Sequence, residues 1–371
     1  MIRAMSALRA IHRANVVGSL LRPDELKQAR AARDAGTLSR ADFKRIEDAA
    51  VDAAIAVQER AGVDVVTDGE MRRLFFFGPL TEAAEGVSVT EGATVVWHDE
   101  HGGTPSVQPV ALTTPIRQTR SLVTEEYAYA RARATRPVKV TLPSPLMFGL
   151  LWKPGVSDAV YPSVFDAFAA AAEIVRAEAQ ALVEMGCEDI QIDAPELATL
   201  VDPEQRAFYE TVGAPAERML TEGVELLNEM VAGIDARLSM HLCRGNYAGR
   251  WMSEGGYEAI SSQVFRRATN YDTFLLEYDD HRSGSFEPLR DVPDDKVVAL
   301  GLVSTKRAEI EPADELLARI DEAARHFPRE QLSLCTQCGF ASAWEGNPVD
   351  AGVQERKLAL VAEVARRAWP G

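Results

Sequence analysis

A regular alternation of short apolar runs with longer amphipathic stretches constrains the fold of this chain more than any other sequence feature. The short runs have the length and apolar content of buried strands, and the longer stretches repeat apolar residues every three to four positions, as helices do. The strand-like runs lie at residues 14–19, 63–67, 138–141, 189–192, 237–240, 273–276, 296–300 and 331–334. Eight strands alternating with helices favour a (β/α)8 TIM barrel over an open doubly wound sheet. Because no linker interrupts the pattern, we expect a single domain over residues 1–371.

Residues 81–120 break this alternation. The stretch is rich in Thr, Val, Gly and Pro, and it contains short segments in which apolar and polar residues alternate. Such segments, separated by turn residues, are typical of β-hairpins. We therefore expect one or two hairpins, over about residues 82–115, inserted beside the barrel.

Charge and composition disfavour several classes of function. The chain carries 40 Lys and Arg against 56 Asp and Glu, a formal net charge of −16, so we expect no nucleic acid or anionic membrane as a partner. We also expect no secretory signal and no membrane span, because no apolar run reaches about 18 residues. Four cysteines are too few for a disulfide framework, which favours a reducing compartment, the cytoplasm. None of these features predicts the oligomeric state.

Polar and metal-binding residue types follow the predicted strands repeatedly. In a TIM barrel the C-terminal ends of the strands form one mouth, and catalytic residues lie there. The residues at these ends are Ser19, Asp68, Glu70, Ser144, Asp193, His241, Cys243, Glu277, Ser304, Lys306, Cys335 and Cys338. We therefore expect the functional site among them.

His241 and Cys243 form half of a candidate zinc site. They are two residues apart at the end of a predicted strand, so their side chains point to the same face. A buried core pair is the alternative interpretation. Glu277 and either Cys335 or Cys338 follow later strands that meet at the same mouth, and Cys338 is favoured because a glycine turn follows it. Imidazole, thiolate and carboxylate ligands suit zinc.

The charge of such a ligand set predicts what the metal would do. Two thiolates and a carboxylate give a zinc site of negative net charge, which activates water poorly. The same site is suited to binding a substrate thiol and keeping it ionised at neutral pH. The predicted chemistry is therefore alkyl transfer to sulfur.

A second acidic group follows the second and fourth predicted strands. Asp68, Glu70 and Asp193 would form a pocket for a cation such as an amino acid ammonium, although helix capping and surface charge are the alternative. The Gly18-Ser19 turn would bind a carboxylate through its backbone N–H groups and hydroxyl. Several basic side chains would either offset substrate anions or remain solvated: Arg72, Arg73, Arg244, Arg282 and Lys306.

Taken together, these motifs resemble the catalytic barrel of cobalamin-independent methionine synthase. The matching segments are Val17-Gly18-Ser19, Asp68-Gly69-Glu70, Gln191-Ile192-Asp193 with Pro195, His241-Leu242-Cys243, Glu277 and Cys338-Gly339. The resemblance implies a zinc ion held by His241, Cys243, Glu277 and Cys338. It further implies that Gly18, Ser19, Glu70 and Asp193 contact the amino acid part of homocysteine.

The chain departs from the family pattern in four places, one of which is Met71-Arg72-Arg73 after Glu70, where the family has a more acidic stretch. It has room for one barrel only, whereas the full-length enzyme carries a second, N-terminal barrel. The family's Asp-Glu-Pro is Asp193-Ala194-Pro195 here, with an acid displaced to Glu196. Residues 301–306 contain no counterpart of the family's histidine after strand seven, so the sequence does not identify a general acid.

The leading hypothesis from the sequence is a zinc-dependent S-methyltransferase that converts homocysteine to methionine. Its expected methyl donor is a methylated folate. One alternative is a zinc thiol alkyltransferase similar to epoxyalkane:coenzyme M transferases. Another is a zinc- or thiol-binding paralogue without turnover.

Overall fold

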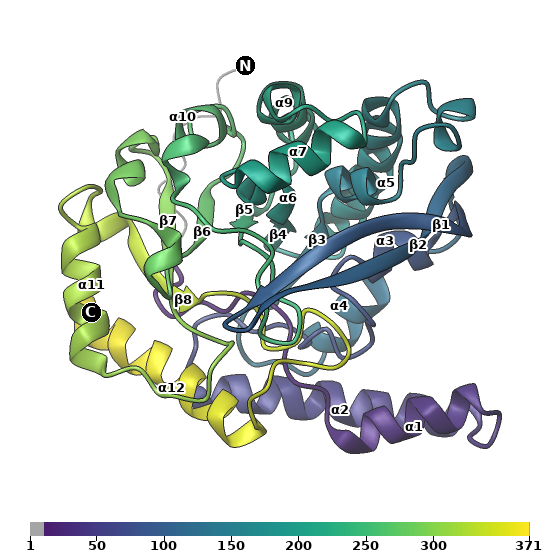
Figure 1. Cartoon of the computed structure of the whole chain (residues 1–371). Coiled ribbons are helices and arrows are strands. Elements are labelled where there is room, and N and C mark those ends of the chain that lie inside the picture. Colours follow the sequence, from purple (N-terminus) through teal and green to yellow (C-terminus); the bar gives the residue numbers. More distant parts are fainter. Residues whose placement is uncertain (1–10, 371) are drawn as a thin grey trace.

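The computed structural model describes residues 11–370, and a parallel six-stranded sheet lies at its centre (Figure 1). The strands are neighbours in chain order, so their C-terminal ends meet on one side. They are β3 (Lys139–Pro143), β4 (Asp189–Asp193), β5 (Arg237–Leu242), β6 (Thr273–Glu277), β7 (Val297–Val303) and β8 (Leu332–Thr336). The α/β class expected from the sequence is thereby confirmed.

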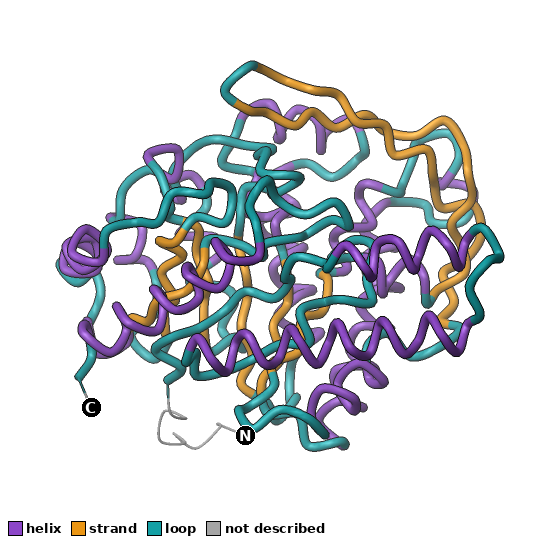
Figure 2. Tube along the Cα trace, turned by 90° about the horizontal axis from the view of Figure 1, so that it is seen from below, coloured by secondary structure: helices purple, strands orange, loops and turns teal. Residues whose placement is uncertain are grey.

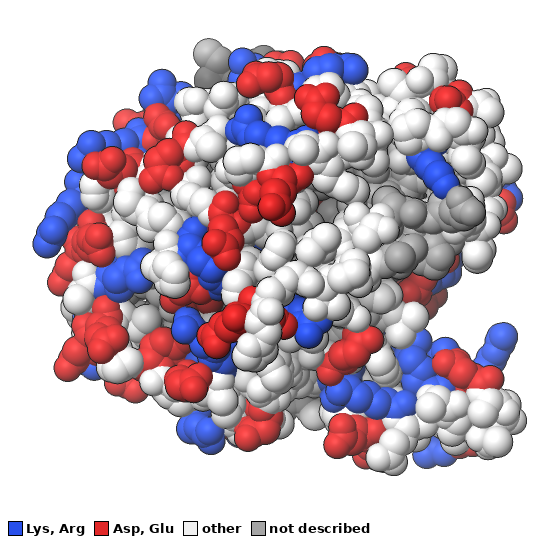
Figure 3. Space-filling view, in the orientation of Figure 1, with Lys and Arg blue, Asp and Glu red and all other residues white. Residues whose placement is uncertain are grey.

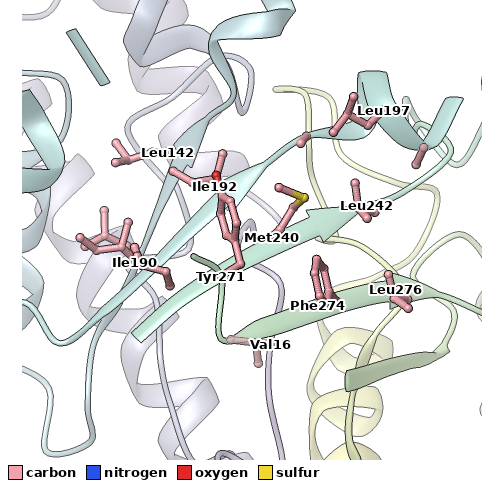
Figure 4. Close-up of a cluster of buried hydrophobic side chains, with 14 of the residues drawn as sticks. Val16, Leu142, Ile190, Ile192, Leu197, Met240, Leu242, Tyr271, Phe274 and Leu276 are labelled. Carbon is pink, nitrogen blue, oxygen red and sulfur yellow. The ribbon is translucent and has the colours of Figure 1, made fainter. Parts of the chain in front are cut away.

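The strands are buried on both faces, as parallel strands covered by helices are. Every residue of β3, β4, β6, β7 and β8 is buried. Figure 4 shows side chains of β4, β5 and β6 in one apolar cluster, including Ile192, Met240 and Phe274. This packing holds the strand ends in fixed positions relative to one another.

Helices surround the sheet on its outer side (Figure 1). The α-helices are α1 (Asp24–Asp34), α2 (Arg40–Ala61), α3 (Gly78–Glu82), α4 (Thr124–Arg131), α5 (Val164–Glu184), α6 (Pro195–Thr199), α7 (Pro203–Thr211), α8 (Ala216–Arg218), α9 (Val224–Met230), α10 (Ser261–Val264), α11 (Ala313–Ala323) and α12 (Ala351–Ala368). The two longest helices begin at residues of the types that commonly start helices. Ser39 caps α2, and Ser163 with Asp166 forms a capping box on α5. None of the described helices is long and apolar enough to cross a membrane.

The repeat of apolar residues every three to four positions also predicts helices over residues 215–232 and 256–269, and the structure corrects both. The helix expected over residues 215–232 is divided into α8, a π-turn (Met219–Gly223) and α9. The helix expected over residues 256–269 is reduced to a 3-10 turn (Tyr257–Ala259) and α10. The short helices α6 and α7 were not predicted, although each begins at a proline, a common first helical residue.

Two of the eight predicted strands are not regular strands. The runs at residues 14–19 and 63–67 pair with the sheet through isolated bridges, Ala14 with Leu334 of β8 and Val66 with Val138 beside β3. The two runs also meet, since Asp64 N donates to Ala14 O at 2.9 Å. Side chains compete for their backbone groups: Asn15 Oδ1 accepts from Val16 N, and Asp64 Oδ2 accepts from Ala14 N. The regular sheet is therefore six-stranded.

The predicted insertion is one long antiparallel hairpin, β1 (Ala84–Asp99) and β2 (Gly102–Gln118). It extends slightly beyond the predicted boundary at residue 115 and arches over one end of the molecule (Figure 2). Near its tip, His98 N donates to Trp251 O at 2.7 Å, and Trp251 N donates to His98 O at 3.0 Å. These bonds fasten the hairpin to the loop that follows β5.

Acidic and basic side chains are interspersed on the face shown in Figure 3. Uncharged residues cover much of the middle of that face, and no continuous basic surface is visible on it. This distribution agrees with the net charge of −16, which disfavours a polyanionic partner.

Candidate functional site

The ends of β5 and β8 bring three predicted metal ligands together. His241 lies near the end of β5, Cys243 directly follows that strand, and Cys338 lies two residues beyond β8. Their ligand atoms all lie within 4.8 Å of one another, and the two sulfur atoms are 4.0 Å apart. All three side chains are buried, and all three line the same cavity.

These three residues fit a zinc ion. His241 Nδ1 lies 3.3 Å from Leu275 O, a partner that places the ring proton on Nδ1. The buried Nε2 atom then has a free lone pair, and it has no hydrogen-bond partner among the described residues. Two thiolates on a tetrahedral zinc lie roughly 3.8 Å apart at Zn–S distances of about 2.3 Å, close to the separation found here. Three protein ligands leave a fourth position for a substrate.

The cysteine pair already favours one ionised sulfur. The hydrogen bond that Cys338 shares with Cys243 is the largest influence on its thiol, and it holds the pKa of Cys338 well below the usual range. Burial opposes this effect, whereas the neighbouring His241 reinforces it. The same hydrogen bond raises the pKa of Cys243, so one proton serves the pair. A thiolate is the form that binds a metal.

Glu277, the fourth predicted ligand, does not join this group. Its Oε1 accepts from Lys306 Nζ at 2.6 Å, and its Oε2 accepts from the backbone N of Arg244 at 2.6 Å. Burial alone would raise the pKa of Glu277, but Lys306 and Arg244 hold it below its usual value. The carboxylate is thus fully engaged by a buried ion pair, and its role as a ligand stays a prediction.

A cavity of about 410 Å³ opens beside the three-donor group. The strand ends form its base, and Val95, Trp97 and Ser106 of the hairpin form part of its wall. Its volume is in the range of small-molecule sites. Because the cavity borders the buried donors, a ligand in it would reach them with little water present.

The predicted substrate residues surround this cavity. Ser19, Glu70 and Asp193 line it, whereas Gly18 lies behind Glu70. A Cβ at position 18 would lie 2.6 Å from Glu70 Oε1, so any larger residue would displace this carboxylate. The hydroxyl of Ser19 accepts from Ala341 N at 3.3 Å, which ties the first predicted turn to the loop that carries Cys338.

The carboxyl groups of Glu70 and Asp193 both have a raised pKa, and Glu70 also has a carboxylate oxygen without a hydrogen bond. Glu70, at an unusual φ of +54°, accepts from Thr141 Oγ1 at 2.8 Å through Oε1, while Oε2 has no partner in the described chain. Burial raises its pKa. Burial also raises the pKa of Asp193 to about 7, although His241 opposes the shift, and Oδ1 accepts from Gln191 Nε2 at 2.7 Å. An ammonium group would stabilise the ionised form of both.

The sequence reasoning did not identify two features of this site. Glu196 lines the cavity from α6, and the only signal for it was the acid displaced from the family motif. The aromatic side chains of the hairpin and of the adjoining loops had no signal at all, because their positions depend on how distant segments fold over the strand ends.

Comparison with known proteins finds relatives over nearly the whole chain. The model of the cobalamin-independent synthase catalytic domain matches residues 13–356. The uncharacterized protein YxjG of Bacillus subtilis is 32% identical over 363 residues, covering 96% of this chain and 94% of that protein. The methionine synthase of Saccharolobus solfataricus is 27% identical over 326 residues, covering 88% and 87%. A B12-independent methionine synthase from Shewanella sp. W3-18-1 shares the fold, with a TM-score of 0.75, 21% identity and coverage of 96% and 98%.

Proposed function

Because the chain belongs to the cobalamin-independent methionine synthase family, we propose that it is a zinc-dependent S-methyltransferase that converts homocysteine to methionine. The observation that carries this proposal is the buried group of His241, Cys243 and Cys338, which borders a cavity that also contains Glu70 and Asp193. A thiol-activating centre and a site for an amino acid ammonium thus lie within one small volume.

Each part of the substrate has a group to meet it. His241, Cys243 and Cys338 would hold zinc, which when bound keeps a substrate thiol ionised at neutral pH. Glu70 and Asp193 would accept hydrogen bonds from the ammonium group, and Ser19 would donate to the carboxylate. The largely apolar cavity would exclude water from the sulfur, which strengthens the electrostatic interactions there. The prediction of a methylated folate as the donor stays untested.

We also propose a closed barrel and a cytoplasmic location. We infer that the runs at residues 14–19 and 63–67 complete an eight-stranded barrel over a single domain, supported by the bridges from Ala14 to β8 and from Val66 to the start of β3. We place the protein in the cytoplasm, supported by four cysteines that are all free.

A coenzyme M-type substrate is disfavoured by the charge of the cavity. Its sulfonate would need a cationic partner, whereas the described cavity residues include Glu70, Asp193 and Glu196 and neither Lys nor Arg. Burying an anion beside carboxylates without a counter-charge is costly. Homocysteine, with its ammonium group, fits the same lining better.

Metal content and methyl transfer in cysteine variants test the proposal. Cys243→Ser and Cys338→Ser should each lose bound zinc, measured by elemental analysis, and should lose methionine formation. Cys187→Ser is the matched control, since this cysteine is buried outside the site with Sγ near Asp189 O, and it should keep both properties. Full zinc content in either site variant would show that the ligand assignment is wrong. A protein that binds zinc and homocysteine but transfers no methyl group from any donor would be the non-catalytic paralogue.

A further inference from the structure

The cavity beside the three-donor group has no cationic side chain to receive an anionic donor. Among the residues that the structure describes, neither Lys nor Arg lines it. The nearby buried cations lie behind the lining and already have partners. Arg73 pairs with Glu126 at 2.8 Å and with Glu70 Oε1 at 3.7 Å, and Arg22 Nη2 donates to the backbone O of Glu70 at 2.7 Å. A donor with several carboxylates, such as a folate, would therefore meet Asp193 and Glu196 in the cavity and no lining Lys or Arg.

Aromatic rings form much of the remaining wall. The lining includes Phe75, Phe76, Phe77, Trp97, Tyr209 and Tyr247. Trp97 packs closely against Gly245, two residues from Cys243, since a Cβ at position 245 would lie 3.0 Å from its ring. The Trp97 and Tyr247 ring centroids are 5.3 Å apart, with the planes tilted by 33°. Aromatic rings that line a cavity attract cations, particularly methylated sulfonium and ammonium groups.

Glu196 adds an unused negative group to this wall. It is only 1% exposed, and neither carboxylate oxygen makes a well-formed hydrogen bond within the described chain; the Ser144 hydroxyl offsets only part of the effect of burial on its pKa. A buried carboxyl group with so little compensation is costly to maintain. Burial raises its pKa to about 8, and a cation in the cavity would favour its ionised form.

We propose that the methyl donor is a small onium cation, a methylsulfonium or quaternary ammonium compound, held in this cavity by Trp97, Tyr247 and Glu196. The proposal rests on the function proposed above, because the same cavity must present the methyl group to the homocysteine sulfur. It names a donor class that differs from the methylated folate expected from the sequence.

The chemistry of an onium donor agrees with the residues available. The homocysteine thiolate forms the new S–CH₃ bond while the bond from the methyl carbon to the onium sulfur or nitrogen breaks. The departing atom keeps that electron pair and leaves as a neutral thioether or tertiary amine. The thiol proton has already passed to solvent when the thiolate formed. No proton has to reach the leaving group, so residues 301–306 need no histidine.

A binding comparison tests the recognition of the cation directly. Choline and 3,3-dimethylbutan-1-ol have nearly the same shape but differ in charge. We expect the zinc-loaded protein to bind choline roughly tenfold or more tightly than the alcohol by calorimetry, with or without homocysteine. Equal affinities for the two compounds would overturn the proposal.

Variants of the lining residues test which side chains give the preference for choline over the alcohol. Trp97→Leu and Glu196→Gln should each reduce the choline-to-alcohol affinity ratio severalfold, whereas Trp97→Phe should largely retain it because it keeps an aromatic face. Trp251→Leu is the control, since this ring stacks on Arg282 outside the cavity, and its ratio should not change. A ratio that is the same in Trp97→Leu and in the unmodified protein would contradict the assigned site.

Methyl-transfer assays with different donors test the donor class independently of the proposed acceptor, homocysteine. Deuteromethylated S-methylmethionine, dimethylsulfonioacetate, glycine betaine and 5-methyltetrahydrofolate would be offered with homocysteine, and labelled methionine would be measured by mass spectrometry. Label from at least one onium compound supports the proposal. Label from the folate alone overturns the donor class and leaves the proposed function intact. Choline selectivity without homocysteine binding would instead contradict the proposed acceptor and still support onium recognition.

Discussion

At the scale of single residues, Glu196 makes stability depend on pH in a defined direction. Its pKa is raised by burial from an ordinary 4.5 to about 8 in the folded protein. Below pH 4.5 the carboxyl group is protonated in both folded and unfolded chains and has no effect. As the pH rises toward 8, the folded chain retains a proton that the unfolded chain has lost, so the free energy of unfolding falls. The full cost is on the order of 5 kcal/mol.

Glu196→Gln should remove this dependence. Unfolding in urea at pH 4.5, 6 and 8 should show the variant gaining stability relative to the unmodified protein as the pH increases. Glu173→Gln, an exposed change on α5, is the control and should give a constant difference. If the difference between Glu196→Gln and the unmodified protein stays constant with pH, the carboxyl group titrates normally.

Lys306 provides a second prediction at this scale, because its ammonium group occupies one carboxylate oxygen of Glu277. Lys306→Met should leave the Glu277 carboxylate buried without its partner and destabilise the metal-free protein by about 3–5 kcal/mol. If Glu277 can then serve as a ligand, zinc should raise the melting temperature more in this variant than in the unmodified protein. Lys306→Arg preserves the charge and should behave more like the parent. An equal zinc-induced shift in Lys306→Met and the parent would remove Glu277 from the ligand set.

The site residues differ in how well their positions could be predicted from the sequence. His241 and Cys243 were predicted to point together because the spacing of two fixes the face of a strand. The order of the strands left Cys335 and Cys338 as candidates, and the glycine turn after Cys338 favoured that residue. The partner of Glu277 was not predictable in the same way. It depends on where the loop after β7 places Lys306, and neither residue type nor spacing determines that position.

At the scale of elements, the β1–β2 hairpin forms part of the cavity wall and is distinct from the strands that carry the metal donors. Its existence was predicted from the alternating pattern, but its place over the strand ends depends on backbone bonds between His98 and Trp251, which leave no signature in side chains. Ser88 and Ala111 are paired across the hairpin. Replacing residues 89–110 with Asn-Gly would join these two positions by a turn suited to a two-residue hairpin.

The shortened protein should keep the metal and lose the cavity wall. Zinc stoichiometry should be unchanged, since the three donors lie on β5 and on the segments following β5 and β8. Choline affinity, in contrast, should fall at least severalfold because Val95, Trp97 and Ser106 are removed. Loss of zinc from the shortened protein would show that the hairpin supports the donors themselves.

At the scale of the whole molecule, the alternation of runs was sufficient to predict a parallel sheet in chain order, yet it overestimated the number of regular strands. The pattern cannot detect that Asn15 and Asp64 direct their side chains at backbone N–H groups that a longer ladder would use. The run at residues 14–19 nevertheless contacts β8 and the segment that follows it. Besides the bridge from Ala14 to Leu334, Phe340 N donates to Ser19 O at 2.8 Å.

The contact between residues 14–19 and the segment after β8, called the joint below, should also position Cys338. A substitution at Gly339 tests this. A Cβ at position 339 would lie 2.0 Å from Ser19 Oγ and 2.9 Å from Ser19 N, so Gly339→Ala must push the two segments apart. Such overpacking should cost about 1–3 kcal/mol in urea unfolding. Because Cys338 is the preceding residue, zinc affinity measured against a competing chelator should fall as well. Gly352→Ala, at an exposed position near the start of α12, should be neutral or stabilising by up to about 1 kcal/mol and leave zinc affinity unchanged. Lost stability with unaltered zinc affinity in Gly339→Ala would mean that the joint supports the fold without positioning Cys338.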